Sequence, residues 1–139
     1  MERKMFKSAF VYLILSLCAG VFFREYTKLS GFTGITSLSF MHLHYFVLGF
    51  MMFLLLGILS PRFSKEPSRQ IILLHIGLNI TEAGFLLRGL DAIHSLPLPS
   101  AAISGIAGIG HILIAVALVW IMVKLTASSG FTSLESDWF

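Results

Sequence analysis

Charged residues are scarce in this chain. Asp, Glu, Lys and Arg make up 12% of its 139 residues, against about 25% in a typical soluble domain. Hydrophobic residues make up 56% of the chain. A soluble fold of this size needs polar residues to cover its surface, and this composition does not supply them. The sequence therefore excludes an ordinary globular domain and predicts a protein surrounded by the lipid bilayer.

Cysteine is almost absent as well. Cys18 is the single cysteine, which excludes an intramolecular disulfide. We expect it to be a small buried packing residue in an apolar helix. The chain has no Cys-x-x-Cys-His motif, so any haem would be held non-covalently. It also has no basic patch interleaved with aromatic residues, and its net charge is only +3. Nucleic acid is therefore not predicted as a partner.

Four long apolar stretches dominate the sequence instead. A transmembrane helix needs about 20 mostly apolar residues. The stretches that qualify cover residues of about 6–23, 40–59, 70–87 and 101–123. Together they predict an all-α fold, an integral membrane four-helix bundle that forms one transmembrane domain over residues 1–139. The connection over residues 24–39 is rich in Ser, Thr and Gly, and we expect it to lie on the surface as a cap.

The first stretch is interpreted as an uncleaved helix, because its apolar run exceeds that of a signal peptide and no small-residue cleavage site follows. Lys and Arg in short loops indicate the orientation of such a protein. One side of the membrane would hold Arg3, Lys4, Lys7, Arg62, Lys65, Arg69 and Lys124, and the other would hold Arg24, Lys28 and Arg88. This imbalance predicts a multi-pass protein of the cell membrane with both termini in the cytoplasm.

Histidine is costly inside a bilayer and usually faces the interior of a helix bundle. The chain has five, of which His94 is expected in a solvated outer loop. His42 and His44 lie within roughly 6 Å of the outer end of the second helix, and His111 lies roughly 10–15 Å below the outer end of the fourth. These three can meet at one level. His75 lies near the inner end of the third helix and is expected to lie apart from the other three.

The two histidines of the second helix point about 200° apart, because they are two residues apart on a helix. One helix therefore does not aim both at one metal atom, but it can present them to two sites. On the fourth helix, small residues surround His111 at helical spacing: Ser104, Ala107, Gly108 and Ala115. This stripe has two interpretations. One is close helix packing with His111 hydrogen-bonded across the interface. The other is clearance for a flat macrocycle with His111 as axial ligand, which three near-level histidines favour.

Haem fits these residues better than a bare metal ion does. A zinc site needs four N, O or S ligands in a tetrahedron, and the outer half offers few carboxylates and no pair of cysteines. Haem needs one or two axial ligands and a large apolar slot. Its propionates need cations, which Arg88, Arg24 and Lys28 supply on the outer side. Copper near His42 and His75 has only weak support.

The third helix carries a polar face made of His75, Asn79 and Glu82, whose spacings of four and three place them on one side. One interpretation is a polar track that carries protons from the inner side. The other, which we favour, is an interhelical hydrogen-bond network. Glu82 is the hardest of these residues to explain by structure alone, because a carboxyl at this depth is expected to be neutral or paired.

One segment resembles a known family. The run His42-Leu43-His44-Tyr45-Phe46-Val47-Leu48-Gly49 is similar to the tenth helix of haem-copper oxidase catalytic subunits, where a His-x-His-Tyr segment ligates two haems from opposite faces of the helix. Those subunits contain three pseudo-equivalent arcs of four helices, and this chain resembles one arc. The whole chain, with Ile103-Ser104-Gly105-Ile106-Ala107-Gly108-Ile109-Gly110-His111, also resembles a small bacterial membrane family of unknown function.

The resemblance implies haem b binding by His42 and His44 beside Tyr45, in a bacterial cell membrane. It also implies a homotrimer that imitates the oxidase arcs. The chain departs from the oxidases because it lacks their His-Pro-Glu-x-Tyr segment and His-His pair, so reductive oxygen chemistry is not expected. His111 has no clear oxidase counterpart and would replace a ligand that the larger enzymes take from another arc.

Our first hypothesis is a haem-binding membrane protein for electron transfer or haem sensing. Two of His42, His44 and His111 would ligate the iron, within one subunit or across an interface. The alternatives are a haem-free channel or transporter subunit that uses the polar face of the third helix, and an assembly partner of a respiratory complex. Catalysis by the isolated chain is not predicted, because no nucleophile–base pair and no complete metal centre is present. The small-residue helix faces favour a homo-oligomer.

Overall fold

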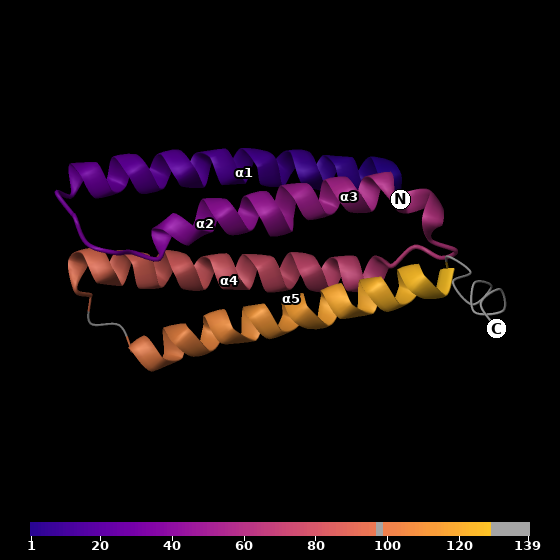
Figure 1. Cartoon of the computed structure of the whole chain (residues 1–139). Helices are drawn as coiled ribbons and strands as arrows, with labels where there is room; N and C mark the ends of the chain where they lie inside the picture. The colour runs from indigo at the N-terminus through magenta and orange to yellow at the C-terminus, as the bar shows by residue number, and fades with distance from the viewer. Residues whose placement is uncertain (97–98, 129–139) are drawn as a thin grey trace, which may run out of the picture.

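The computed structural model describes residues 1–96 and 99–128, and this part of the chain is all-α without strands (Figure 1). Four of its helices are long and apolar enough to cross a membrane. They are α1 (Glu2–Leu29), a second span over Leu38–Ile58, α4 (Ser68–His94) and α5 (Ser100–Ser128). The predicted all-α fold with four helices suited to a bilayer is therefore confirmed.

The helices reach further than the apolar stretches predict. The first continues to Leu29 rather than ending near residue 23, and α4 continues to His94 rather than ending near residue 87. Left-handed backbone follows both ends, at Gly31 (φ 62°) and at Ser95 (φ 51°), as is common after a helix. A helix satisfies its own backbone hydrogen bonds, so it does not have to stop where the hydrocarbon stops. Arg24, Lys28 and Arg88 consequently lie on helices and not in loops.

The second span is not one uniform α-helix. It consists of α2 (Leu38–His44), a π-helical segment η1 (Tyr45–Met51) and α3 (Met52–Ile58), and a short 3-10 turn η2 (Ser60–Arg62) follows. Gly49 of η1 lies against α1, where an added Cβ would come within 2.7 Å of the Tyr12 Cβ. An added Cβ on Gly57 would come within 2.6 Å of the Phe6 ring. These two glycines allow α1 to pack closely along the second span.

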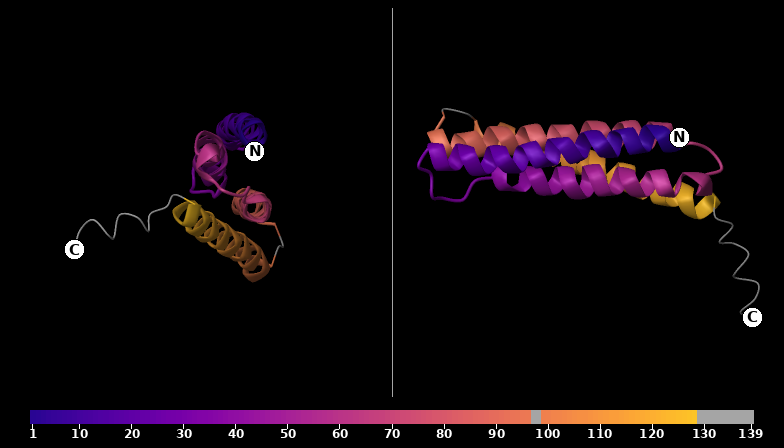
Figure 2. Two further views of the ribbon diagram at one scale, coloured as in Figure 1. Left: turned by 90° about the vertical axis from the view of Figure 1, so that its right-hand side faces the viewer. Right: turned by 90° about the horizontal axis from the view of Figure 1, so that it is seen from above.

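The four spans form a chain of neighbours. The first helix packs along the second span, α2 packs against α4, and α5 packs almost entirely against α4 (Figure 2). The start of α1 and the end of α5 lie at the same end of the bundle (Figure 1). We call it the terminal end, and the other the opposite end. Which end faces the cytoplasm stays a prediction from the distribution of Lys and Arg.

Small residues bring α4 and α5 into close contact. An added Cβ would lie 2.8 Å from the Ala107 Cβ if built on Gly84, and 2.9 Å from the Ile114 backbone nitrogen if built on Gly77. On α5, Gly110 lies against the Thr81 side chain. The predicted stripe around His111 is therefore divided. Ala107 packs on α4, whereas Ser104, Gly108 and Ala115 are exposed, because α4 covers only one side of α5.

Buried side chains from all four spans gather in one larger cluster. Phe53, Leu74 and Leu78 have no exposed surface and form the centre of the larger cluster. The prediction that Cys18 is buried is wrong, because its side chain is exposed. Only one side of α1 is covered by the second span, and Cys18 lies on the uncovered side.

A candidate haem-ligand pair and a polar cluster

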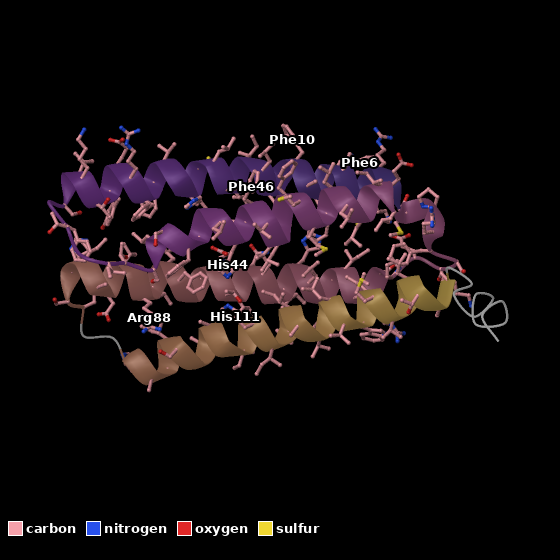
Figure 3. All side chains as sticks on the ribbon, in the orientation of Figure 1. Phe6, Phe10, His44, Phe46, Arg88 and His111 are labelled. Atoms are coloured by element: carbon pink, nitrogen blue, oxygen red, sulfur yellow. The ribbon has the colours of Figure 1, made fainter. Side chains whose placement is uncertain are left out.

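Two of the predicted histidines come together from different helices. His44 ends α2 and His111 lies on α5, and their ring centroids are 5.8 Å apart with the planes at 87°. Phe85 of α4 lies beside both rings, with centroids 4.8 Å from His44 and 5.8 Å from His111. Figure 3 shows the two histidines opposite each other between the second span and α5. Three helices therefore meet at this cluster of rings, which we call the His44–His111 pair.

Hydrogen bonds to the backbone assign the tautomers of this pair. The Nδ1 atom of His44 lies 3.0 Å from the Phe40 carbonyl oxygen, and that of His111 lies 2.8 Å from the Ala107 carbonyl oxygen. A carbonyl only accepts, so each Nδ1 carries the ring proton. Each Nε2 then keeps a free lone pair, and neither has a hydrogen-bond partner among the described residues. This is the form in which a neutral histidine ligates a metal.

His42 lies on a different side of α2 from this pair. Its Cβ lies 3.6 Å from a Cβ built on Gly20 of α1, and its carbonyl oxygen accepts a hydrogen bond of 2.8 Å from Ser16 Oγ. The structure therefore places His44 and His111 together and His42 toward α1. This agrees with the angle of about 200° between residues two apart on a helix.

The remaining residues proposed for the haem site differ in their positions. Arg88 is exposed on α4, one helical turn beyond Phe85 toward the opposite end (Figure 3). Gly108 is exposed on α5, and a Cβ built on it would meet nothing within 4 Å. Tyr45 is not part of this cluster, because its ring stacks on Tyr12 with centroids 5.8 Å apart. Arg24 pairs with Glu25 at 3.7 Å on the exposed surface.

A second cluster surrounds His75 in the half of the bundle nearer the terminal end. The Tyr12 hydroxyl lies 2.6 Å from His75 Nδ1, and the Asn79 amide donates to the Tyr12 oxygen at 3.1 Å. The Tyr12 oxygen accepts from Asn79, and its own proton is available to His75 Nδ1 in the tautomer that carries the ring proton on Nε2. The ring proton of His75 is then on Nε2, which lies 3.5 Å from Ser8 Oγ. Tyr45 extends the cluster by donating to Asn79 Oδ1 at 3.4 Å.

Sequence reasoning missed Tyr12, which is the centre of this cluster. Its ring stacks on Phe53 and His75, with centroid distances of 5.3 and 5.5 Å. A signal for it was present in the sequence, because Ser8, Tyr12 and Ser16 recur every four residues on an otherwise apolar helix. Together with α4, this polar stripe borders an open pocket of about 300 Å³, lined by Lys7, Ser8, Val11, Tyr12, Leu15, His75 and Asn79.

Glu82 lies one helical turn beyond Asn79 on the same side of α4. Only 1% of its surface is exposed, and neither carboxyl oxygen has a hydrogen-bond partner within the described residues. It is close enough to Tyr45 for the carboxyl and the phenol to interact electrostatically. On the predicted polar face of the third helix, His75 and Asn79 are therefore hydrogen-bonded, whereas Glu82 has no hydrogen-bond partner among the described residues.

The other histidines do not join a metal centre. His94 ends α4, and its Nε2 lies 2.7 Å from the Tyr26 hydroxyl, so the prediction of an outer-loop position is wrong although the residue is exposed. His42 and His75 belong to different clusters, which leaves the copper suggestion without added support. Over residues 1–96 and 99–128, no three His, Cys, Asp or Glu side chains gather as they would around a bare metal ion.

Replacing Tyr12 with Phe is expected to destabilise the protein, because it removes the hydrogen bonds to His75 and Asn79 while keeping the ring. Interhelical hydrogen bonds in membranes contribute about 0.6 kcal/mol on average, so we expect a loss of about 1 kcal/mol in the free energy of unfolding. Unfolding in SDS measures this loss. The matched control is Tyr26→Phe, which removes one exposed hydrogen bond at the opposite end. Equal effects of the two changes would contradict the structural importance of the Tyr12 cluster.

Comparison with known proteins places the chain in a family. A model of a family described as a protein of unknown function, DUF2871, matches residues 2–128. No curated protein and no solved structure matches the chain. The family match covers nearly all of the described residues, so the chain belongs to the DUF2871 family.

Proposed function

We propose that this member of the DUF2871 family binds haem b non-covalently in the membrane and uses it for electron transfer or haem sensing. The observation that carries the proposal is the His44–His111 pair. Its rings lie 5.8 Å apart, and each has its Nδ1 fixed by a backbone carbonyl and its Nε2 free. A ligating histidine commonly donates its other ring N–H in this way, which fixes its orientation and raises its basicity.

The residues present fit an iron porphyrin in three respects. Metal–imidazole bonds are about 2 Å long, so two ligands of one ion need nitrogen atoms about 4 Å apart, which suits neighbouring rings. An exposed surface adjoins His111, because a Cβ on Gly105 or on Gly108 would meet nothing within 4 Å. Arg88 is exposed toward the opposite end, where it can pair with a propionate.

The residues of this chain have separate roles in the proposal. His44 and His111 hold the group, Arg88 orients it, and Phe85 packs beside both histidines and covers one side of the pair. When bound, haem supplies reversible one-electron chemistry whose potential depends on its axial ligands and on burial. His42 lies on the α1 side and would serve a second group, as the oxidase resemblance implies.

A homo-oligomer belongs to the same proposal. The fourth span packs almost entirely against α4, which leaves Ser104, Gly108 and Ala115 exposed. Exposed small residues on a membrane helix favour close contact with another helix. The resemblance to oxidase arcs favours three copies and a respiratory-chain partner.

The absorption spectrum of the purified protein tests this proposal. Haem added to the protein in detergent is expected to give a sharp Soret band and the visible bands of a low-spin, bis-histidine species. The matched control is the double variant His44→Ala, His111→Ala, which is expected to give the spectrum of free haem. Equal spectra for the two proteins would overturn the assignment. Solute transport by the haem-free protein in liposomes would favour the channel hypothesis instead.

A further inference from the structure

We propose that Glu82 is a proton-binding site inside the membrane and that it exchanges its proton with the terminal end of the bundle only. Glu82 is not a member of the His44–His111 pair, although the rings of that pair pack close by, and its proton is tested in the haem-free chain. Three features of the structure support the inference: the environment of the carboxyl, the pocket on its side toward the terminal end, and the rings on its side toward the opposite end.

The environment of Glu82 favours a neutral carboxyl. The side chain is 1% exposed and has neither a hydrogen bond nor an ion pair within the described part of the chain. Burying an unpaired carboxylate costs several kcal/mol in the free energy of folding, as a rough order of magnitude. Protonation avoids this cost and supplies a donor. The Tyr45 oxygen, which gives its own proton to Asn79, has no donor among the described residues.

The titratable groups around this stretch of α4 come from every neighbouring helix. Tyr12 belongs to α1, His44 and Tyr45 belong to the second span, and His111 belongs to α5. On α4 itself the nearest titratable groups are Arg88 and His75, which lie about two turns away on either side of Glu82. No Lys or Arg pairs with Glu82 among the residues described, so a proton is the cation that this site can hold.

The route to the terminal end passes through the open pocket beside His75. A volume of about 300 Å³ holds on the order of ten water molecules. The lining runs from Lys7 near the start of α1 to the Asn79 amide. From Asn79 to Glu82 the helix rises by about 4.5 Å. Water filling this pocket as far as Asn79 would come within about one helical turn of the carboxyl.

The hydrogen bonds along this route have one direction. Tyr45 donates to Asn79, and Asn79 donates to Tyr12. Tyr12 in turn donates to His75, whose Nε2–H faces Ser8. All the donors are thus directed toward the terminal end, and Glu82, which makes no hydrogen bond to Tyr45, stands outside this series. A purely structural network would satisfy the acid, whereas here the acid is the unpartnered member.

Rings close the route toward the opposite end. Phe85 lies one turn beyond Glu82 and packs against His44 and His111. The rings of Phe85, His44 and His111 pack together here from α4, α2 and α5, and His111 is itself exposed. Access from one end and closure at the other are what a proton-loading site needs, whereas a continuous channel would be open at both ends.

Infrared spectroscopy of the haem-free full chain in detergent tests the proton site. A protonated carboxyl absorbs apart from the amide bands and shifts in D₂O. We expect Glu82→Gln to remove this band. The matched control, Glu25→Gln, changes an exposed acid and is expected to leave it. If the Glu82→Gln protein does not fold, labelling of the native chain with a membrane-permeant carbodiimide replaces it, and mass spectrometry is expected to find the adduct on Glu82 and not on Glu25.

The rate of hydrogen–deuterium exchange at this band tests the route. Ser8→Phe fills the pocket and is expected to slow the exchange severalfold. The control is Cys18→Phe, which adds the same ring to an exposed position of α1 and is expected to leave the rate unchanged. A band that survives Glu82→Gln, a carbodiimide adduct on Glu25 alone, or an exchange rate indifferent to Ser8→Phe would each overturn the inference.

Discussion

His111→Ala is expected to abolish the low-spin haem spectrum, and His44→Ala is expected to do the same. The two rings lie 5.8 Å apart on different helices, so loss of either leaves at most one axial ligand and a high-spin iron. The visible absorption spectrum and the haem-to-protein ratio after gel filtration measure this effect. Phe85→Ala is expected to keep both ligands but to broaden the spectrum, because Phe85 packs against both rings.

Two other histidines provide the controls for this prediction. His42→Ala changes a residue on the same helix but on the α1 side, and His94→Ala changes an exposed residue that pairs with Tyr26. Both variants are expected to keep the low-spin spectrum of the His44–His111 pair. A spectrum that depends on His42 and not on His111 would show that the oxidase-like arrangement of ligands is correct and that our pair is not.

Gly110→Ala is expected to weaken the packing of α5 on α4 more than any other single methyl group would. The added Cβ would come within 2.7 Å of the Thr81 backbone nitrogen and within 2.9 Å of the Gly77 carbonyl oxygen. These neighbours are backbone atoms, so a rotation of side chains does not relieve the overlap. Overpacking of this kind costs about 1–3 kcal/mol, which unfolding in SDS measures as a loss in the free energy of unfolding.

Gly105→Ala is the control for this change, since it adds the same methyl group to the same helix. A Cβ on Gly105 would meet nothing within 4 Å. Alanine is also the better helix former, by about 1 kcal/mol in soluble helices. We expect Gly105→Ala to be neutral or slightly stabilising. If both variants lost the same stability, the small residues of α5 would matter for helix formation and not for contact with α4.

The sequence predicts the four-helix fold, but it does not predict where the helices end. Four apolar stretches predict four helices because a bilayer leaves the backbone few other choices. Hydrophobicity indicates where the hydrocarbon ends, but α1 and α4 continue to Leu29 and His94. The π-helical turn after His44 has no signal in the sequence, because no proline or charge marks it.

The candidate site was likewise predicted only in part from the sequence. Depth predicted that His42, His44 and His111 can meet at one level, and the structure brings together the rings of His44 and His111 but places His42 toward α1. The exposure of Cys18 was not predictable, because it depends on which side of α1 the second span covers. Tyr12 was missed because hydroxyl side chains at helical spacing in an apolar run carry little weight until His75 is known to face them.

The π-helical segment η1 sets the rotation between the two α-helical parts of the second span, α2 and α3. It separates His44 from Phe53, which anchors the second span beside Tyr12. Successive residues of an α-helix are rotated by about 100° about the helix axis. The extra residue of a π-helical turn therefore changes the direction of His44 relative to Phe53. A one-residue deletion within Tyr45–Met51 would tighten the turn and swing the His44 ring away from His111 while leaving the packing around Phe53 intact. The number of residues in the π-helical turn therefore determines whether His44 faces His111, so the site depends on the length of this turn as well as on the histidine.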